Sequence, residues 1–298
     1  MTERHHGGLD GRLDAEFFVP GNSSFTEFVA AHRPELLHRD DQFLPAGVRP
    51  DPNQFPHGTT VLALTYRDGV LLAGDRRATM GNLIAQRDLE KVIPADDHTA
   101  VAFAGSVGMA LDMVKLFQVE LTHFEKVEGA PMSLRAKANR LSGMIRQNLG
   151  QAMQGLAVVP LLAGYEPTGS ESGNGSGNGS GGRRGRIFGY DVTGGTYEKF
   201  GFHAEGSGSP YARGALKKLY REDMSRRDAA LAALQALYDA ADDDSATGGP
   251  DIGRRIFPIV SLITEDGFER LPDQETEDLS HEMVAARRSR PDGPVALP

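Results

Sequence analysis

The sequence contains no cysteine, which excludes disulfide bonds, thiolate nucleophiles and cysteine-ligated zinc. This absence fits a reducing compartment, and we expect a cytoplasmic protein. The sequence also lacks any apolar run close to the roughly 20 residues that a membrane helix needs. The N-terminal segment, with Glu3-Arg4-His5-His6, has no apolar core of the kind found in signal peptides. We therefore expect neither secretion nor membrane insertion.

The chain has fewer basic than acidic residues. The chain has 32 lysines and arginines against 41 acidic residues, a net charge of −9, and its basic residues are dispersed. A nucleic-acid-binding face requires clustered cations, so we expect no nucleic acid partner. The histidines show no ligand spacing, and Asp242 and Asp243 resemble solvated loop acids, so we predict neither a metal nor another cofactor.

The composition divides the 298 residues into three parts. Residues 1–58 are rich in proline, glycine, histidine and charge, and we interpret them as a leader. Residues 59–272 carry the regular apolar patterns of a folded domain, interrupted at about 167–184 by a Gly/Ser stretch that is typical of a flexible surface loop. Residues 273–298 are polar and charged and contain proline, so we predict a disordered tail.

The apolar periodicity predicts alternating pairs of strands and helices. We expect strands at 60–66, 70–74, 91–94, 99–104, 158–165, 186–190, 196–201, 256–264 and 268–271. We expect helices from Val107 to Phe124, from a Ser133 cap to Leu149, from Pro210 to Tyr220, and from a Ser225 cap to Tyr238. This order predicts an α+β protein in which two face-to-face sheets are covered by helices, a four-layer αββα sandwich.

The most informative motif is Gly58-Thr59-Thr60 at the start of the first strand. A threonine hydroxyl is a poor nucleophile, but cleavage after Gly58 would place an α-amino group of pKa about 8 beside the Thr59 hydroxyl as its base. Taken alone, Thr59 is more simply an ordinary strand residue, and Asp75 and Lys91 could form a surface ion pair of little value. Asp75, however, follows Leu-Leu-Ala-Gly and Lys91 precedes Val-Ile, contexts that indicate burial and favour a functional interpretation.

These motifs together resemble the β subunit of the 20S proteasome of the actinobacterial type, over about residues 59–272. They are Gly58-Thr59-Thr60, Gly74-Asp75-Arg76-Arg77, Lys91, Ala104-Gly105, Gly206-Ser207-Gly208-Ser209 and Asp244-Ser245-Ala246-Thr247-Gly248-Gly249. Most are weak individually, but their order and spacing are jointly specific. The resemblance implies the N-terminal nucleophile hydrolase fold and a threonine endopeptidase that degrades unfolded proteins.

The resemblance also implies a role for each matched residue. Thr59 would be the nucleophile, exposed by its own attack on the Gly58 carbonyl, and the leader would shield it until assembly. Lys91 would lower the pKa of the Thr59 amine and hydroxyl, with Asp75 orienting it. The Gly105 N–H would stabilise the oxyanion. Ser207, Asp244 and Thr247 would hold the free amine, with Thr247 at a position where the family usually has serine.

Substrate contacts follow from the same resemblance. The backbone at Thr79, Gly105 and Val107 would pair with an extended peptide as an added strand. The pocket walls would be Ala78, Leu89, Ile93 and Phe103, whose apolar character suggests cleavage after hydrophobic residues.

The implied partners are proteasome α subunits, further copies of the chain in seven-membered rings, and a ring ATPase that feeds substrates. Three alternatives remain open. The simpler bacterial ATP-dependent peptidase of the same fold has a very short leader and lacks the Asp-Ser-x-Ser/Thr-Gly-Gly turn. A non-catalytic structural subunit would lack the Gly-Thr junction or the lysine. A metabolic amidase with an N-terminal threonine would need no long leader.

Overall fold

The computed structural model describes residues 58–166 and 185–290. The predicted leader up to residue 57, the Gly/Ser stretch and the last eight residues of the predicted tail lie outside the described residues. The first half of the domain contains β1 (Thr60–Tyr66), β2 (Gly69–Gly74), β3 (Ala78–Met80), β4 (Leu83–Gln86), β5 (Val92–Asp96), β6 (Thr99–Gly105), α2 (Val107–Glu128), α3 (Leu134–Gln147), α4 (Leu149–Ala152) and β7 (Val158–Tyr165). The second half contains β8 (Gly185–Tyr190), β9 (Thr196–Lys199), β10 (Phe202–Gly206), α5 (Ser209–Leu219), α6 (Arg226–Asp243), β11 (Ile259–Thr264), β12 (Gly267–Arg270) and α7 (Asp273–Ser289).

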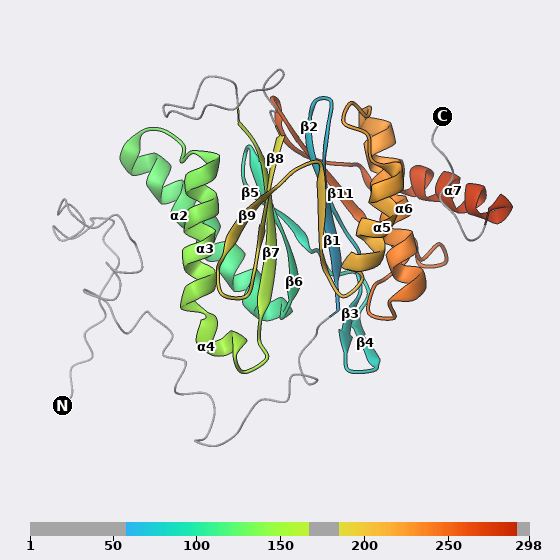
Figure 1. Ribbon diagram of the computed structural model, residues 1–298, viewed down its shortest axis with the longest axis horizontal. Coiled ribbons are helices and arrows are strands. Elements are labelled where there is room, and N and C mark those ends of the chain that lie inside the picture. The colour runs from blue at the N-terminus through green and yellow to red at the C-terminus, as the bar shows by residue number, and fades with distance from the viewer. Residues whose placement is uncertain (1–57, 167–184, 291–298) are drawn as a thin grey trace, which may run out of the picture. The chain divides into compact units, whose positions relative to one another are not determined.

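Two antiparallel five-stranded sheets form the centre of the domain. Their strand orders are β10-β1-β2-β11-β12 and β5-β6-β7-β8-β9. Helices α2 and α3 lie on the outer side of the second sheet, and α5 and α6 lie on the outer side of the first (Figure 1). This arrangement confirms the predicted αββα sandwich.

Strand β1 shows how the layers are held together. Val61 and Ala63 face the cluster of buried residues between the two sheets, whereas Leu62 and Leu64 face the cluster under α5 and α6. All four side chains are fully buried. Because alternate residues of a strand point to opposite faces, burial on both faces places β1 in the interior of the sandwich.

Several local signals act as predicted. The Ser133 and Ser225 hydroxyls accept hydrogen bonds from the backbone N–H groups of Ala136 and Asp228, at 3.3 and 3.2 Å, and so cap α3 and α6. Strands β7 and β8 pair as one antiparallel hairpin whose last matched residues are Tyr165 and Gly185. None of the helices in the two described ranges has the length and apolar character required to cross a membrane.

The strand expected at 196–201 is β9, which ends at Lys199, and an additional strand that the sequence did not predict, β10, follows at Phe202–Gly206 in the other sheet. Strand β9 pairs with β8, whereas β10 pairs with β1. Gly201, with φ of +76°, lies between them and lets the chain pass from one sheet to the other. The short β3–β4 hairpin and the four-residue helix α4 are further elements that the periodicity did not predict.

The prediction of a disordered tail from residue 273 is wrong for residues 273–289, which form α7. The buried positions of α7 recur at helical spacing and are Thr276, Leu279, Ser280, Met283 and Arg287. Arg287 forms an ion pair with Asp239 of α6 and lies 5.2 Å from the ring centre of Tyr238. Packing against α6 therefore stabilises a helix that has few apolar residues of its own.

Candidate active site

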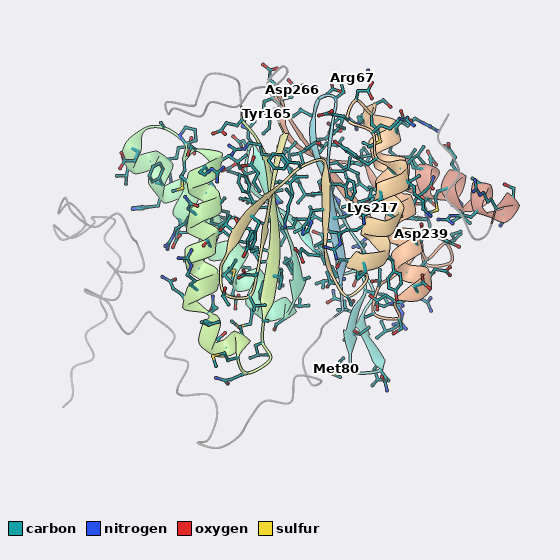
Figure 2. All side chains as sticks on the ribbon, in the orientation of Figure 1. Arg67, Met80, Tyr165, Lys217, Asp239 and Asp266 are labelled. Atoms are coloured by element: carbon teal, nitrogen blue, oxygen red, sulfur yellow. The ribbon has the colours of Figure 1, made fainter. Side chains whose placement is uncertain are left out.

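The predicted nucleophile lies at the start of β1, at the end of the sandwich opposite the β1–β2 turn. Figure 2 labels Arg67 in that turn and Met80 on the β3–β4 hairpin, and the two lie at opposite ends of the domain. The Thr59 carbonyl accepts a hydrogen bond from the Ser207 N–H at 3.0 Å. Thr60 is held on the other side, because its N–H donates to Asp75 Oδ1 at 2.8 Å. Neighbouring segments thus position Thr59, which is only 2% exposed.

Lys91 and Asp75 form a fully buried ion pair. Lys91 Nζ lies 2.6 Å from Asp75 Oδ1, and both side chains are 0% exposed. Asp75 Oδ2 also accepts hydrogen bonds from the backbone N–H groups of Arg77 and Gly248, at 2.9 and 2.8 Å. With the Thr60 N–H on Oδ1, the carboxylate has three backbone donors in addition to the ammonium. A buried charge needs such partners to offset the loss of water.

The Lys91 ammonium uses all three of its protons. Besides Asp75, it donates to the carbonyl oxygens of Arg77 at 2.5 Å and Gly58 at 3.2 Å. Three acceptors match the three donors of an ammonium, whereas a neutral amine has only two N–H bonds. Burial lowers the pKa of the Lys91 ammonium below its ordinary value, and the Asp75 charge opposes that shift.

The Gly58 carbonyl lies between the hydroxyl and the ammonium. Thr59 Oγ1 donates to the Gly58 oxygen at 2.5 Å, and Lys91 Nζ approaches the same oxygen. Gly58 has a φ of +85°, and a Cβ there would lie 2.5 Å from Thr79 Oγ1 and 2.7 Å from Ala246 Cβ. Only glycine therefore fits between the threonine and its surroundings.

The three residues predicted to hold the free amine, Ser207, Asp244 and Thr247, also lie together. Asp244 Oδ2 accepts hydrogen bonds of 2.6 Å from both the Ser207 and the Thr247 hydroxyls. The Thr247 hydroxyl lies 2.6 Å from that of Thr60, and the Ser207 hydroxyl lies 3.4 Å from the Thr59 carbonyl. Asp244 caps the C-terminus of α6, so this helix and the β10–α5 turn meet beside Thr59.

Gly105 ends β6 with a φ of +102°, and a Cβ there would lie 2.2 Å from the Ala157 carbonyl oxygen. Two residues earlier, the Phe103 N–H donates to the Lys91 carbonyl at 3.1 Å. Because N–H groups two residues apart in a strand point to the same side, the Gly105 N–H points toward the side from which Lys91 comes. The oxyanion role of this N–H stays a prediction.

The predicted substrate residues are placed less uniformly. Thr79 and Val107 are partly exposed, at the second position of β3 and the first of α2. Of the predicted pocket walls, Ile93 is partly buried, whereas Ala78, Leu89 and Phe103 are buried. Ile93 and Phe103 belong to the cluster beneath α2 and α3. The pocket therefore stays a prediction.

Three residues that the sequence did not predict also contribute to the site. The Arg77 carbonyl accepts from Lys91, the Gly248 N–H donates to Asp75, and Thr60 links Asp75 to Thr247. Arg77 and Gly248 act through backbone groups, which every residue except proline offers, so the residue types in their motifs do not predict these roles. Among the described residues, no group of three or more histidine, aspartate or glutamate side chains could hold a metal ion.

Comparison with known proteins agrees with this geometry. A family model described as "Proteasome subunit" matches residues 55–252. Proteasome subunit beta 1 of Streptomyces avermitilis is 74% identical over 296 residues, which cover 99% of each chain. Proteasome subunit beta of Streptomyces griseus is 55% identical over 286 residues, 96% of each chain. Proteasome subunit beta 2 of Thermomonospora curvata is 55% identical over 300 residues, 99% of each chain. The chain therefore belongs to the proteasome subunit family and is a β subunit of the actinobacterial type.

Proposed function

We propose that this chain is the catalytic β subunit of a proteasome core particle, a threonine endopeptidase that hydrolyses unfolded polypeptides. Its nucleophile is Thr59, exposed by self-cleavage of the Gly58–Thr59 bond. The observation that carries the proposal is the position of the Gly58 carbonyl oxygen, 2.5 Å from Thr59 Oγ1 and 3.2 Å from the buried Lys91 ammonium. The bond to be cut thus lies beside both a nucleophile and a cation.

Self-cleavage proceeds by an N-to-O acyl shift. Thr59 Oγ1 attacks the Gly58 carbonyl carbon, and the Lys91 ammonium stabilises the negative charge that develops on the carbonyl oxygen. The hydroxyl proton passes to the Thr59 nitrogen as the C–N bond breaks, which leaves Gly58 as an ester on the threonine oxygen and the Thr59 nitrogen as a free amine. Water hydrolyses the ester, which releases residues 1–58 as a carboxylic acid and regenerates the hydroxyl.

Peptide hydrolysis reuses the same atoms. The freed amine, with a pKa of about 8, accepts the hydroxyl proton as Oγ1 attacks the substrate carbonyl. The Gly105 N–H stabilises the oxyanion, and the Ser207, Asp244 and Thr247 hydrogen bonds hold the amine in place. The leaving amine takes the proton, and water then hydrolyses the acyl ester. The Lys91 charge makes the Thr59 amine and hydroxyl easier to deprotonate.

Thr79, Gly105 and Val107 are proposed to pair with the substrate backbone, and Ala78, Leu89, Ile93 and Phe103 to shape the pocket for apolar side chains. The proposed partners are α subunits, six further copies of this chain in a ring, and a ring ATPase, in the cytoplasm. A purely structural subunit is the competing function. It is disfavoured because the Gly-Thr junction and the lysine are both present and lie in contact.

The test is co-expression of the full chain with an actinobacterial α subunit, followed by intact mass measurement and N-terminal sequencing of the assembled complex. Wild type should begin at Thr59 and cleave a fluorogenic peptide that ends in an apolar residue. Thr59→Ala should stay uncut at this bond, whereas Thr65→Ala, a matched change at the other end of β1, should be processed normally. An assembled wild type that retains residue 1 would favour the structural subunit, and cleavage of Thr59→Ala at residue 58 would exclude self-cleavage.

A further inference from the structure

A small cavity lies next to the Lys91–Asp75 pair, at the base of the β3–β4 hairpin. Its volume is about 40 Å³, and Arg76, Arg77 and Arg87 contribute to its lining. Arg77 immediately precedes β3 and Arg87 immediately follows β4, so the three arginines bracket the hairpin, which projects from the sandwich in Figure 1. We refer to this site as the arginine cavity.

None of the three guanidinium groups has a carboxylate partner among the described residues. Arg76 donates from Nη2 to the Asp88 carbonyl at 2.8 Å, and Arg77 donates from Nη1 to the Ser245 carbonyl at 3.0 Å. The Nε of Arg76 is buried and lacks a hydrogen-bond partner. A buried donor without a partner costs about 1–3 kcal/mol. Arg76 therefore lines the cavity with its guanidinium incompletely hydrogen-bonded by the described residues.

The nearby acidic groups neutralise this cluster only in part. Asp251 also lines the cavity, but its carboxylate is bound by Arg254, through Nη1 at 2.8 Å and the backbone N–H at 3.0 Å. Asp75 is buried and paired with Lys91. Hydrogen bonds from Arg254 are the main cause that lowers the pKa of Asp251, and the charge of Arg87 contributes as well. The lining thus holds three arginines and one aspartate, which leaves an excess of positive charge. Such a concentration of positive charge is unusual in a chain of net charge −9.

The backbone of a second segment, at Gly248, lines the cavity close to Arg77. A Cβ at this position would lie 2.8 Å from Arg77 Cβ. Phe257 lines another side and limits the space. A volume of about 40 Å³ gives room for a small ion.

We propose that the arginine cavity binds a small oxyanion, a carboxylate or a phosphate group. The guanidinium fork matches the two oxygens of either group, and ionised partners strengthen the hydrogen bonds. An anion held by Arg76 and Arg87 would join the base of the β3–β4 hairpin to the loop that contains Gly248. The same loop donates to Asp75, so the bound ion would brace the outer side of the Lys91–Asp75 pair.

The test is the thermal unfolding midpoint of the full chain in sodium phosphate, sodium acetate and sodium chloride, at one pH and equal ionic strength. At an anion concentration ten times its Kd, the ratio of folded to unfolded protein should rise about elevenfold over chloride. Arg87→Gln, at an exposed position, should abolish this rise without preventing folding. Arg213→Gln removes the same charge from the exposed face of α5 and should leave the rise unchanged.

Comparison of phosphate with acetate distinguishes the two possible classes of ligand. A rise with phosphate alone identifies a phosphate site, and a rise with acetate alone identifies a site for a carboxylate such as a peptide C-terminus. Equal midpoints in all three salts would overturn the proposal. A rise that persists in Arg87→Gln would overturn it as well, because the anion would then act elsewhere on the chain.

Discussion

The buried Lys91–Asp75 pair predicts a large loss of stability when its cation is removed. In Lys91→Met the side chain keeps most of its volume, but Asp75 is left as a buried charge, and the Gly58 and Arg77 carbonyls lose a donor. Removing one partner of a buried pair typically costs about 3–5 kcal/mol. The three backbone N–H groups that still bind Asp75 should keep the loss near the lower end, about 3 kcal/mol.

The assay is urea unfolding followed by circular dichroism, with every variant built on Thr59→Ala so that all chains keep the same length. Asp75→Asn and the double variant complete a cycle, in which we expect a coupling energy of about 1–3 kcal/mol. Arg270→Met is the matched control, because Arg270 pairs with Glu90 at 2.7 Å but the two side chains are 36% and 54% exposed. Its loss should stay below about 1 kcal/mol. Similar losses for Lys91→Met and Arg270→Met would refute the argument from burial.

Three further predictions concern other parts of the chain. Gly58→Ala should block processing, measured by intact mass after co-expression, because its Cβ would collide with a threonine hydroxyl; Gly129→Ala, also at positive φ but with open space around it, should be processed normally. Burial is the main cause that raises the pKa of Tyr66 from 10.0 to about 12. The unfolded state therefore loses this proton first, and the free energy of unfolding should fall between about pH 10 and 12 in wild type relative to Tyr66→Phe, as measured by urea titrations. Replacing residues 167–184 with a short Gly/Asn turn, which keeps the Glu166–Arg186 ion pair, should raise the free energy of unfolding by at most about 2 kcal/mol, because the flanking strands already pair and a shorter loop costs less entropy to close.

Each of these predictions has a clear contrary outcome. Normal processing of Gly58→Ala would mean that the close contacts around residue 58 relax at little cost. Parallel pH profiles for wild type and Tyr66→Phe would mean that the phenol ionises as readily in the folded protein as in the unfolded chain. A loop-replacement variant that folds but fails to assemble with α subunits would give the Gly/Ser stretch a role in assembly.

The layers of the fold were predictable because burial leaves a period in the sequence. Strand β1 is a continuous apolar run of strand length, helix α3 carries apolar residues at spacings of three to four, and serine marks the start of α3. Helix α7 was missed for the opposite reason, since its buried stripe includes Thr276, Ser280 and Arg287, which a search for apolar residues passes over. Strand β10 was missed because the chain passes into the other sheet between Lys199 and Phe202, at Gly201, a step that the composition of the segment does not reveal.

The site was predictable to the extent that side chains form it. Asp75 and Lys91 could be paired from their order and their apolar flanks, and the described geometry places them 2.6 Å apart. The Arg77 carbonyl and the Gly248 N–H could not be anticipated, because every residue other than proline offers the same backbone groups and only the fold decides which ones converge. The arginine cavity was likewise invisible in the sequence, since it joins residues 76–87 to residues 248–258.

The position of Thr59 at the entrance to β1 has a consequence for the chain end that cleavage would create. New termini usually fray, because few contacts restrain them. Here the next residue begins a strand that is paired on one side with β2 and on the other with β10, and the Thr59 carbonyl is held by Ser207. A terminus produced at this point would inherit the rigidity of an internal strand residue. The amine and the hydroxyl would then need almost no further loss of conformational entropy before reacting.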